Sequence, residues 1–287
     1  MDRVKVTHCG KTDFQWGKRT YVMGILNITP DSFSGDGITT IEDATKQAHR
    51  FIEEGADILD VGGESTRPNS TSISTDEELK RVIPVIERLV RTISIPISID
   101  TMKFEVARQA LDAGATILND QCGLKKEPRL AQLAAKKGVS LVLMSNQREK
   151  GGYDTKAGRD TGFYQDVMTE VITFLQGSIE TARKAGVAEE NIIIDPGIGF
   201  GKTWQQDIEI IRRLSELKAL GQPILIGTSR KSLIKLVLNL PANQRVEGTA
   251  ATVAIGVANG ADIVRVHDVK QMVRVCKMAD AIVRGVS

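Results

Sequence analysis

Short apolar runs alternate along the chain with longer stretches in which apolar residues recur every three or four positions. In the stretch 41–54, the apolar residues fall on one face of a helix. A similar pattern over 79–90 follows Asp76 and Glu77, and acidic residues are typical of the first turn of a helix. The pattern therefore predicts amphipathic helices that alternate with buried strands.

Six joints between these pieces share one feature, which is a glycine between the end of a helical pattern and the next apolar run. These glycines are Gly55, Gly114, Gly138, Gly186, Gly221 and Gly260. Glycine after a helix can take the left-handed conformation that ends the helix. A buried strand after each stop indicates repeated helix–strand units around a parallel sheet.

The apolar runs predict eight strands, at 21–26, 56–61, 95–99, 115–118, 139–143, 192–194, 223–226 and 261–264. Eight strands with helical connections predict an α/β fold, the TIM (β/α)8 barrel, with an open doubly wound sheet as the alternative. Residues 1–20 lie outside the repeat and predict a short N-terminal β-hairpin against the barrel floor. We expect one domain over 1–287, with the barrel in 21–285.

Composition excludes several classes of function. The 287 residues suit one α/β barrel, and a net charge of +2 gives no argument for binding nucleic acid or a membrane surface. Three widely spaced cysteines suggest neither a disulfide framework nor a zinc site. No apolar run is long enough to span a membrane, and the first residues lack an apolar signal segment, so we expect a cytoplasmic protein.

Polar side chains follow seven of the eight predicted strands, and in a barrel these strand ends meet at one mouth. Asp100, Asn119 and Asp195 follow three different strands. Two carboxylates and an amide suit a flat ring that carries several N–H donors and a carbonyl, such as a 2-amino-4-oxopyrimidine edge. For each aspartate taken alone, the alternative is a helix N-cap.

Other strand ends carry groups suited to anions. Arg67, Arg265 and His267 suit a ligand that bears phosphate, and Asn27 could bind magnesium through its amide oxygen. The stretch 229–232 is expected to open a helix whose free N–H groups bind a carboxylate or phosphate. A plain N-cap serine at 229 is the alternative.

One glycine-rich segment partly matches a phosphate-binding loop. Gly197 and Gly201 precede Lys202 and Thr203, but the two glycines are four positions apart, one short of the G-x-x-x-x-G-K-[ST] spacing. We therefore predict no nucleotide hydrolysis from this segment.

Taken together, these loops resemble those of the dihydropteroate synthase family, which are pterin-binding TIM-barrel enzymes. The resemblance covers about residues 20–285, and its motifs occur in the order of the family. These motifs are Met23-Gly24-Ile25-Leu26-Asn27-Ile28-Thr29-Pro30-Asp31-Ser32-Phe33-Ser34, Asp60-Val61-Gly62-Gly63-Glu64-Ser65-Thr66-Arg67-Pro68, Ser98-Ile99-Asp100-Thr101, Asn119-Asp120, Asp195-Pro196-Gly197-Ile198-Gly199-Phe200-Gly201-Lys202, Ser229-Arg230-Lys231-Ser232 and Arg265-Val266-His267-Asp268-Val269.

The resemblance implies an activity and a role for each matching residue. Members join a dihydropterin diphosphate to 4-aminobenzoate in folate biosynthesis, with Mg2+ as cofactor, and the resemblance also implies a homodimer. The implied pterin ligands are Asp100, Asn119, Asp195 and Lys231. The implied diphosphate ligands are Asn27 (through the metal), Arg67, Arg265 and His267. The implied 4-aminobenzoate site is Thr66, Arg67, Pro68, Phe200, Lys231 and Ser232. The implied catalytic residues are Asp100, Lys231, Arg265 and His267.

The chain departs from the family pattern at three places. Ser145 stands where histidine is common, the order of glycine and aspartate differs over 34–37, and the stretch 147–161 lacks the usual local motif. Two alternatives to the synthase therefore stay open. One is a paralogue that binds pterin without turnover, and the other is a pterin-dependent methyltransferase domain.

Overall fold

Eight parallel strands form the barrel in the computed structural model, which describes residues 3–29, 38, 40–64, 72–148, 153–154, 159–160 and 166–285. The sheet order is β10-β7-β6-β5-β4-β3-β12-β11, and a bridge between Ile194 and Ile224 joins its two ends. The strands are β3 (Tyr21–Asn27), β4 (Ile58–Gly62), β5 (Ile97–Asp100), β6 (Ile117–Asp120), β7 (Ser140–Met144), β10 (Ile192–Asp195), β11 (Leu225–Ile226) and β12 (Ile263–Val266). The predicted TIM barrel is confirmed, and the open sheet is excluded.

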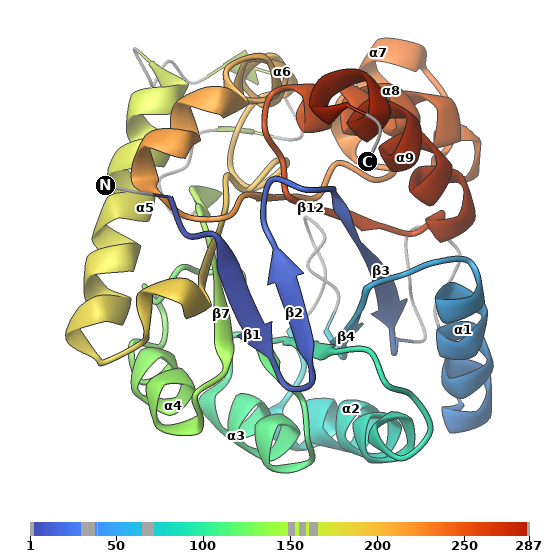
Figure 1. The fold of residues 1–287 in the computed structure, drawn as a ribbon, viewed down its shortest axis with the longest axis vertical. Coiled ribbons are helices and arrows are strands. Elements are labelled where there is room, and N and C mark those ends of the chain that lie inside the picture. Colours follow the sequence, from blue (N-terminus) through green and yellow to red (C-terminus); the bar gives the residue numbers. More distant parts are fainter. Residues whose placement is uncertain are drawn as a thin grey trace.

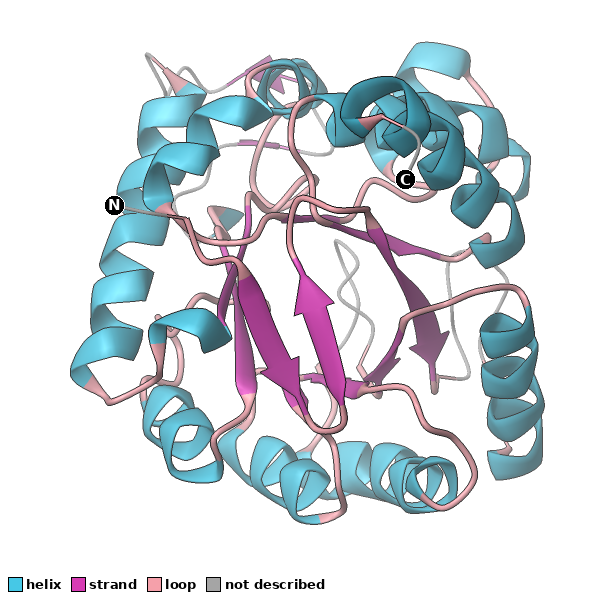
Figure 2. Ribbon diagram, viewed as in Figure 1, coloured by secondary structure: helices cyan, strands magenta, loops and turns pink. Residues whose placement is uncertain are grey.

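Helices surround the barrel on its outside (Figures 1 and 2). They are α1 (Ile41–Glu53), α2 (Thr75–Val90), α3 (Phe104–Asp112), α4 (Arg129–Lys137), α5 (Val167–Lys184), α6 (Trp204–Arg212), α7 (Ser232–Leu238), α8 (Val246–Ala258) and α9 (Val269–Arg284). Short 3-10 helices lie at η2 (Glu189–Asn191), η3 (Leu214–Leu220) and η4 (Ala242–Gln244), and β8 (Tyr153–Asp154) pairs with β9 (Arg159–Asp160).

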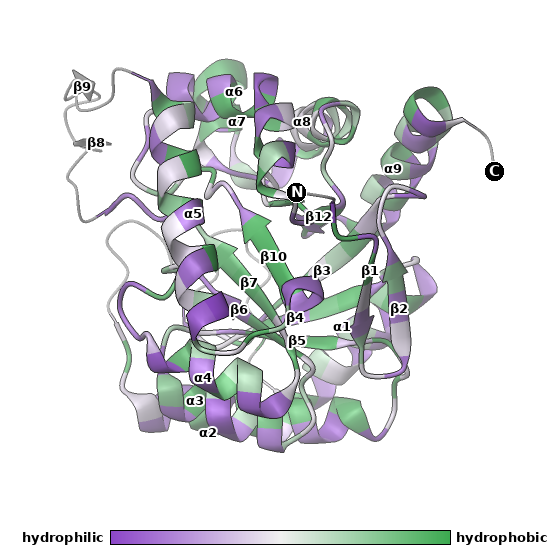
Figure 3. Ribbon diagram, turned by 60° about the vertical axis from the view of Figure 1, so that its left-hand side comes forward, coloured by the Kyte–Doolittle hydropathy of each residue, from purple (hydrophilic) through white to green (hydrophobic). Residues whose placement is uncertain are grey.

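Alternation along the strands separates two cores, because neighbouring side chains of a strand point to opposite faces. The outer core packs the strands against the apolar faces of the helices. Figure 3 shows apolar strands at the centre, surrounded by helices of mixed polarity. The inner core fills the lower barrel, where Met23, Ile58, Ile117, Val142 and Ile193 are fully buried. Two positions nearer the mouth, Ile58, Ile117 and Ile193 are followed by Asp60, Asn119 and Asp195, which belong to the candidate site.

The N-terminal hairpin closes the lower end of the barrel. Its strands β1 (Val6–Cys9) and β2 (Thr12–Gln15) are antiparallel, and they lie across the barrel opening in Figure 1. Phe14 is fully buried, and its ring packs edge to face with Tyr21 of the first barrel strand. The expected hairpin is confirmed, and it supplies part of the inner core.

All six predicted helix-stop glycines have positive φ, from +64° at Gly138 to +112° at Gly114. Each lies between a helix and the next strand, where a left-handed residue turns the chain back toward the barrel. The three cysteines are free and buried. Among the described helices, none is long and apolar enough to cross a membrane.

Candidate active site

A buried ion pair network occupies the mouth end of strands β4, β5 and β12. The Arg265 guanidinium donates from Nε to Asp60 Oδ2 at 2.6 Å and from Nη2 to Asp100 Oδ2 at 2.8 Å. Asp60 is fully buried, and Asp100 is 8% exposed. One cation thus joins two carboxylates from neighbouring strands, and the ion pairs offset the cost of burying the three charges.

Two amide side chains complete this network. The Asn119 side chain donates to both oxygens of Asp60, at 3.4 and 3.3 Å, and the Gln121 amide donates to Asp100 Oδ1. Asn119 lies on β6 beside Asp100, with which it is paired in register. The predicted neighbours Asp100, Asn119 and Arg265 are therefore brought together.

Burial changes the acidity of Asp100. Removal from water, together with the nearby charge of Asp60, raises the pKa of this carboxyl to about 7, although Arg265 and the Gln121 hydrogen bond oppose the shift. The Arg265 pKa is raised despite burial, because Asp60 and Asp100 stabilise its charge. Asp100 can therefore change protonation near neutral pH.

Asp195 and Lys231 form the opposite side of the mouth. Burial raises the pKa of Asp195, and the charge of Lys231 opposes that shift. Burial lowers the pKa of Lys231 to about 8, against the charges of Asp195 and Asp207. The Lys231 ammonium donates to the carbonyl oxygen of Ile198, in the loop that follows Asp195. This lysine is thus a donor whose charge is only modestly stabilised by its surroundings.

Two cations contact the ring of Phe200. The Arg148 guanidinium carbon is 4.3 Å from the ring centroid, and Lys231 Nζ is 4.8 Å from it. Phe200 is 7% exposed. Cation–π contacts of this kind orient both the ring and the cations, so Phe200 and Lys231 belong to one local unit.

His267 and Ser232 lie beyond the seventh and eighth strands. His267 Nδ1 is 2.9 Å from Ser229 Oγ, and the His267 backbone N–H donates to the same oxygen. Helix α7 begins at Ser232 with Lys231 as its N-cap, so the expectation that the stretch 229–232 opens a helix is confirmed. Ser229 is not the N-cap serine, because its hydroxyl contacts His267 instead.

Asn27 ends β3 at the mouth, beside Gly62 of β4. It is partly exposed, so its amide is accessible from the mouth. Within the described residues, no cluster of three or more histidine, cysteine, aspartate or glutamate side chains could hold a metal. A metal at Asn27 would therefore have to take most of its oxygen ligands from a substrate and water.

The N-cap alternatives for the two aspartates are wrong. Helix α3 has Lys103 as its N-cap, and α6 has Thr203 with a complete capping box. Asp195 accepts a hydrogen bond from the backbone of Gly197, which orders the start of its loop, and caps no helix. The predicted residues Thr66, Arg67 and Pro68 and the segment 34–37 lie outside the described residues.

Sequence reasoning missed two members of the site, Asp60 and Gln121. Asp60 was included in the motif at the end of the second strand, but no role was predicted for it. The period-2 alternation would have placed it on the same face as Ile58 and Gly62, inside the barrel. Gln121 follows Asn119 by two positions, and no motif marks it.

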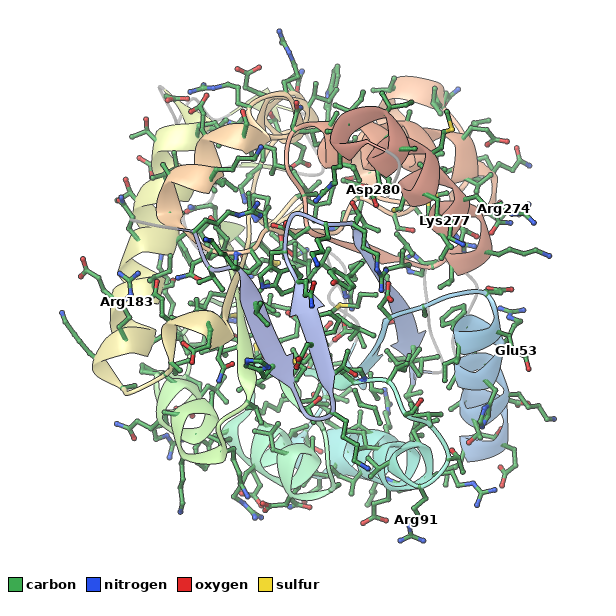
Figure 4. The ribbon with its side chains drawn as sticks, viewed as in Figure 1. Glu53, Arg91, Arg183, Arg274, Lys277 and Asp280 are labelled. Atoms are coloured by element: carbon green, nitrogen blue, oxygen red, sulfur yellow. The ribbon has the colours of Figure 1, made fainter. Side chains whose placement is uncertain are left out.

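Figure 4 shows charged side chains around the outside of the barrel. Glu53, Arg91 and Arg183 extend from the outer helices away from the barrel. Charges on these helices form mostly short-range surface pairs, such as Arg108 with Asp112. Such exposed pairs add little stability and mark no site. The buried charges at the mouth differ because they come from strands far apart in sequence.

Comparisons with known proteins agree with this geometry. A family described as "Pterin binding enzyme" matches residues 23–267. The dihydropteroate synthase of Clostridium beijerinckii is 49% identical over 96% of this chain and 98% of its own, and that of Bacillus subtilis is 45% identical over 98% and 95%.

Solved structures give the same result. A Clostridium difficile dihydropteroate synthase crystallised in the presence of pteroic acid has a TM-score of 0.86 and 48% identity, and covers 94% of this chain and 99% of its own. A Xanthomonas albilineans dihydropteroate synthase with 4-aminobenzoic acid has a TM-score of 0.88 and 39% identity, and covers 99% and 100%.

Proposed function

Because the chain belongs to the dihydropteroate synthase family, we propose that it condenses (7,8-dihydropterin-6-yl)methyl diphosphate with 4-aminobenzoate to form 7,8-dihydropteroate and diphosphate in folate biosynthesis. The observation that carries the proposal is the buried group of Asp100, Asn119 and Asp195 at one barrel mouth, with Arg265 and Lys231 beside it. The solved relatives with pteroic acid and 4-aminobenzoic acid support the two substrates.

The pterin ring binds against the carboxylates and amides of the strand ends. Asp100 and Asp195 accept hydrogen bonds from the N–H groups of the ring, and Asn119 and Lys231 donate to its acceptors. A buried site of this kind rejects rings that lack these groups, because its polar atoms would then remain unpaired. Asp60 and Gln121 are positioning residues, since they hold Arg265, Asn119 and Asp100 in place.

The diphosphate binds near Arg265 and His267, with Arg67 and Asn27 as further ligands. Nη1 of Arg265 has no hydrogen-bond partner within the described part of the chain, so this nitrogen remains for a phosphate oxygen. The Asn27 amide oxygen suits Mg2+, which would be held mainly by the diphosphate and water. Magnesium, when bound, supplies positive charge to the leaving diphosphate.

The 4-aminobenzoate site lies beside the loop that carries Phe200. Phe200 offers an apolar ring face, and Lys231 and Ser232 lie at the start of α7, where a carboxylate finds unpaired backbone N–H groups. Thr66, Arg67 and Pro68 would complete this site. The amine of 4-aminobenzoate would then face the exocyclic methylene of the pterin.

The reaction needs charge stabilisation more than a strong base. The bond between the methylene carbon and the diphosphate oxygen breaks, and both electrons leave with the diphosphate. Arg265 and His267 stabilise the charge that develops on it. The electron-rich dihydropterin shares the positive charge left on the methylene carbon, so bond breaking runs ahead of attack by the amine. Secondary deuterium isotope effects near unity at this methylene would contradict that sequence of events.

The experiment that tests the function measures diphosphate release from the pterin diphosphate with and without 4-aminobenzoate. We expect release to require 4-aminobenzoate, dihydropteroate to form, and Lys231→Ala and Asp100→Asn to lose at least about 100-fold in kcat/KM. Pterin binding without turnover would identify the non-catalytic paralogue. Methyl transfer to a corrinoid protein would identify the methyltransferase.

We also propose a homodimer in the cytoplasm. Large apolar side chains are exposed on three neighbouring helices: Val237 on α7 at 55%, Ile255 on α8 at 50% and Ile282 on α9 at 72%. Exposed apolar groups gathered in one region are typical of protein interfaces. Three free cysteines suit a reducing compartment.

A further inference from the structure

The lysine of the glycine-rich segment is buried and contacts backbone only. Lys202 is 4% exposed, and its ammonium donates to the carbonyl oxygens of Ser145 at 3.0 Å, Gly197 at 2.9 Å and Phe200 at 3.3 Å. All three of these acceptors are backbone carbonyl oxygens. Because its three N–H donors are used by these carbonyls, none remains for a phosphate oxygen, and a different role is needed to explain a buried cation.

The number of hydrogen bonds that Lys202 makes matches the number of N–H donors on its side chain. An ammonium has three N–H donors and no acceptor, and here it meets three carbonyl oxygens. A neutral amine would leave one carbonyl without this donor. Burial lowers the pKa of Lys202 to about 8, and the charges of Asp207 and Asp195 oppose the shift.

These three carbonyls belong to two different strand-end loops. Ser145 follows β7, whereas Gly197 and Phe200 lie in the loop after β10. The two loops are packed too tightly for side chains between them, since a Cβ on Gly197 would lie 2.0 Å from the Ser145 oxygen. Lys202 therefore joins the two loops at their point of closest approach.

The loop 197–201 positions two site residues, Phe200 within the loop and Lys231, which contacts it. Ile198 accepts the hydrogen bond of Lys231, Phe200 packs its ring against Lys231, and the Gly199 N–H is held by Asp207 at 2.9 Å. The ammonium of Lys202 thus fixes the backbone on both sides of Ile198. Loss of its three hydrogen bonds would release the loop toward the mouth.

We propose that Lys202 is a positioning residue that fastens the loop 197–201 to Ser145 and so fixes Phe200 and the partner of Lys231 for the aromatic amine substrate. The inference rests on the proposed function and deepens it. The contact uses the backbone carbonyl of Ser145, so it does not depend on the side chain at this position.

The test compares Lys202→Met, which loses all three donors at similar length, with Lys202→Gln, which keeps two. We expect the KM for 4-aminobenzoate to rise about tenfold or more in Lys202→Met and less in Lys202→Gln, since each lost bond leaves a buried carbonyl unpaired. The KM for the pterin diphosphate should change less, about threefold at most, because Asp100 and Asn119, two of its four proposed ligands, are held by a separate network.

The matched control is Arg284→Met at the other end of the barrel. Arg284 is also a largely buried cation that donates to a backbone carbonyl, that of Ala261, at 2.9 Å. This variant should lose stability but keep both KM values. If Lys202→Met fails to fold, the two KM values of Lys202→Gln are compared with those of the wild type in the same way.

Each outcome has one meaning. A selective rise in the KM for 4-aminobenzoate, graded from glutamine to methionine, supports the positioning role. Folded Lys202 variants with unchanged KM values, or with both KM values raised equally, overturn it. A wild-type chain that forms no dihydropteroate rejects the proposed function and this inference with it, whereas an active wild type with unchanged variants rejects the inference alone.

Discussion

At the scale of single residues, Arg265 carries one positive charge between two buried carboxylates. Asp60 and Asp100 together carry two negative charges when ionised, so the group as a whole is negative. This imbalance, together with burial, explains why the pKa of Asp100 is raised to about 7 while its partner Arg265 remains charged. Asp100 therefore changes charge near neutral pH.

The pKa values of Asp100 and Lys231 predict that kcat/KM depends on pH as a bell-shaped curve. Ionised Asp100 accepts the pterin N–H groups, so kcat/KM for the pterin diphosphate should rise with pH through about 7. Protonated Lys231 is the donor, so the same constant should fall above about 8. Initial rates over the range from about pH 5.5 to 9 measure both limbs. Asp100→Asn should flatten the rising limb, and a rising limb that survives in this variant would assign it to another group.

The site residues show how far sequence can lead at this scale. Asp100, Asn119, Asp195 and Arg265 were predicted from their place after apolar runs, and the structure brings them to one mouth. The contacts between them could not be predicted, because the partners of Arg265 are 205 and 165 positions away. Which carboxylate lies opposite which guanidinium depends on barrel register, and no local pattern encodes that register.

At the scale of elements, glycine has two distinct uses in this chain. Six glycines end helices, and sequence identified all six because the left-handed conformation after a helix is a local requirement. Gly197, Gly199 and Gly201 also have positive φ, but Gly197 and Gly201 meet backbone from another strand end. Contact with a distant segment cannot be predicted from the local pattern, so the sequence identified only the glycines that end helices.

The two uses predict different costs of substitution. Gly138→Ala should lower the free energy of unfolding by about 1–2 kcal/mol, because φ is +64° and no atom lies within 4 Å of the new methyl. Gly197→Ala should cost more than about 3 kcal/mol, because its methyl would overlap the Ser145 carbonyl as well. Urea unfolding measures both, and equal costs would refute the distinction.

At the scale of the whole molecule, the residues that stabilise the barrel and the residues of the candidate site lie at opposite ends. The hairpin and inner core fill one end, and the charged network fills the other. The architecture followed from sequence because each helix–strand unit carries its own pattern. Closure of the barrel was a consequence of the number of units. The packing of the hairpin under the barrel was only suggested by its position outside the repeat.

A floor substitution tests this separation. Phe14→Ala should lower the free energy of unfolding by about 3–5 kcal/mol, because Phe14 is fully buried, and leave both KM values unchanged. Phe200→Ala at the mouth should instead raise the KM for 4-aminobenzoate. Thermal unfolding and steady-state kinetics on both variants give the comparison. A changed KM in Phe14→Ala would show that the two ends are coupled.

The proposed dimer is also tested at this scale. Paired substitutions Ile255→Glu and Ile282→Glu should give a monomer in sedimentation velocity, because two charges would be buried without partners at the interface. Ile41→Glu on α1, where the isoleucine is 39% exposed, is the control and should leave the mass unchanged. A monomeric wild type would reject the dimer.

The barrel closes at the junction of β10 and β11, here called the seam. This junction has the weakest strand pairing in the barrel, which affects hydrogen exchange. The strands β10 and β11 meet only at the bridge between Ile194 and Ile224, whereas β3 and β4 are paired over five residues. Backbone amides at this seam should therefore exchange with deuterium sooner than those of the other barrel strands. Asp195 and Lys231 lie on opposite sides of the seam, so a bound pterin would span it. Slower deuterium exchange of the Ile194 amide on adding pterin would show that the ligand stabilises the junction between β10 and β11.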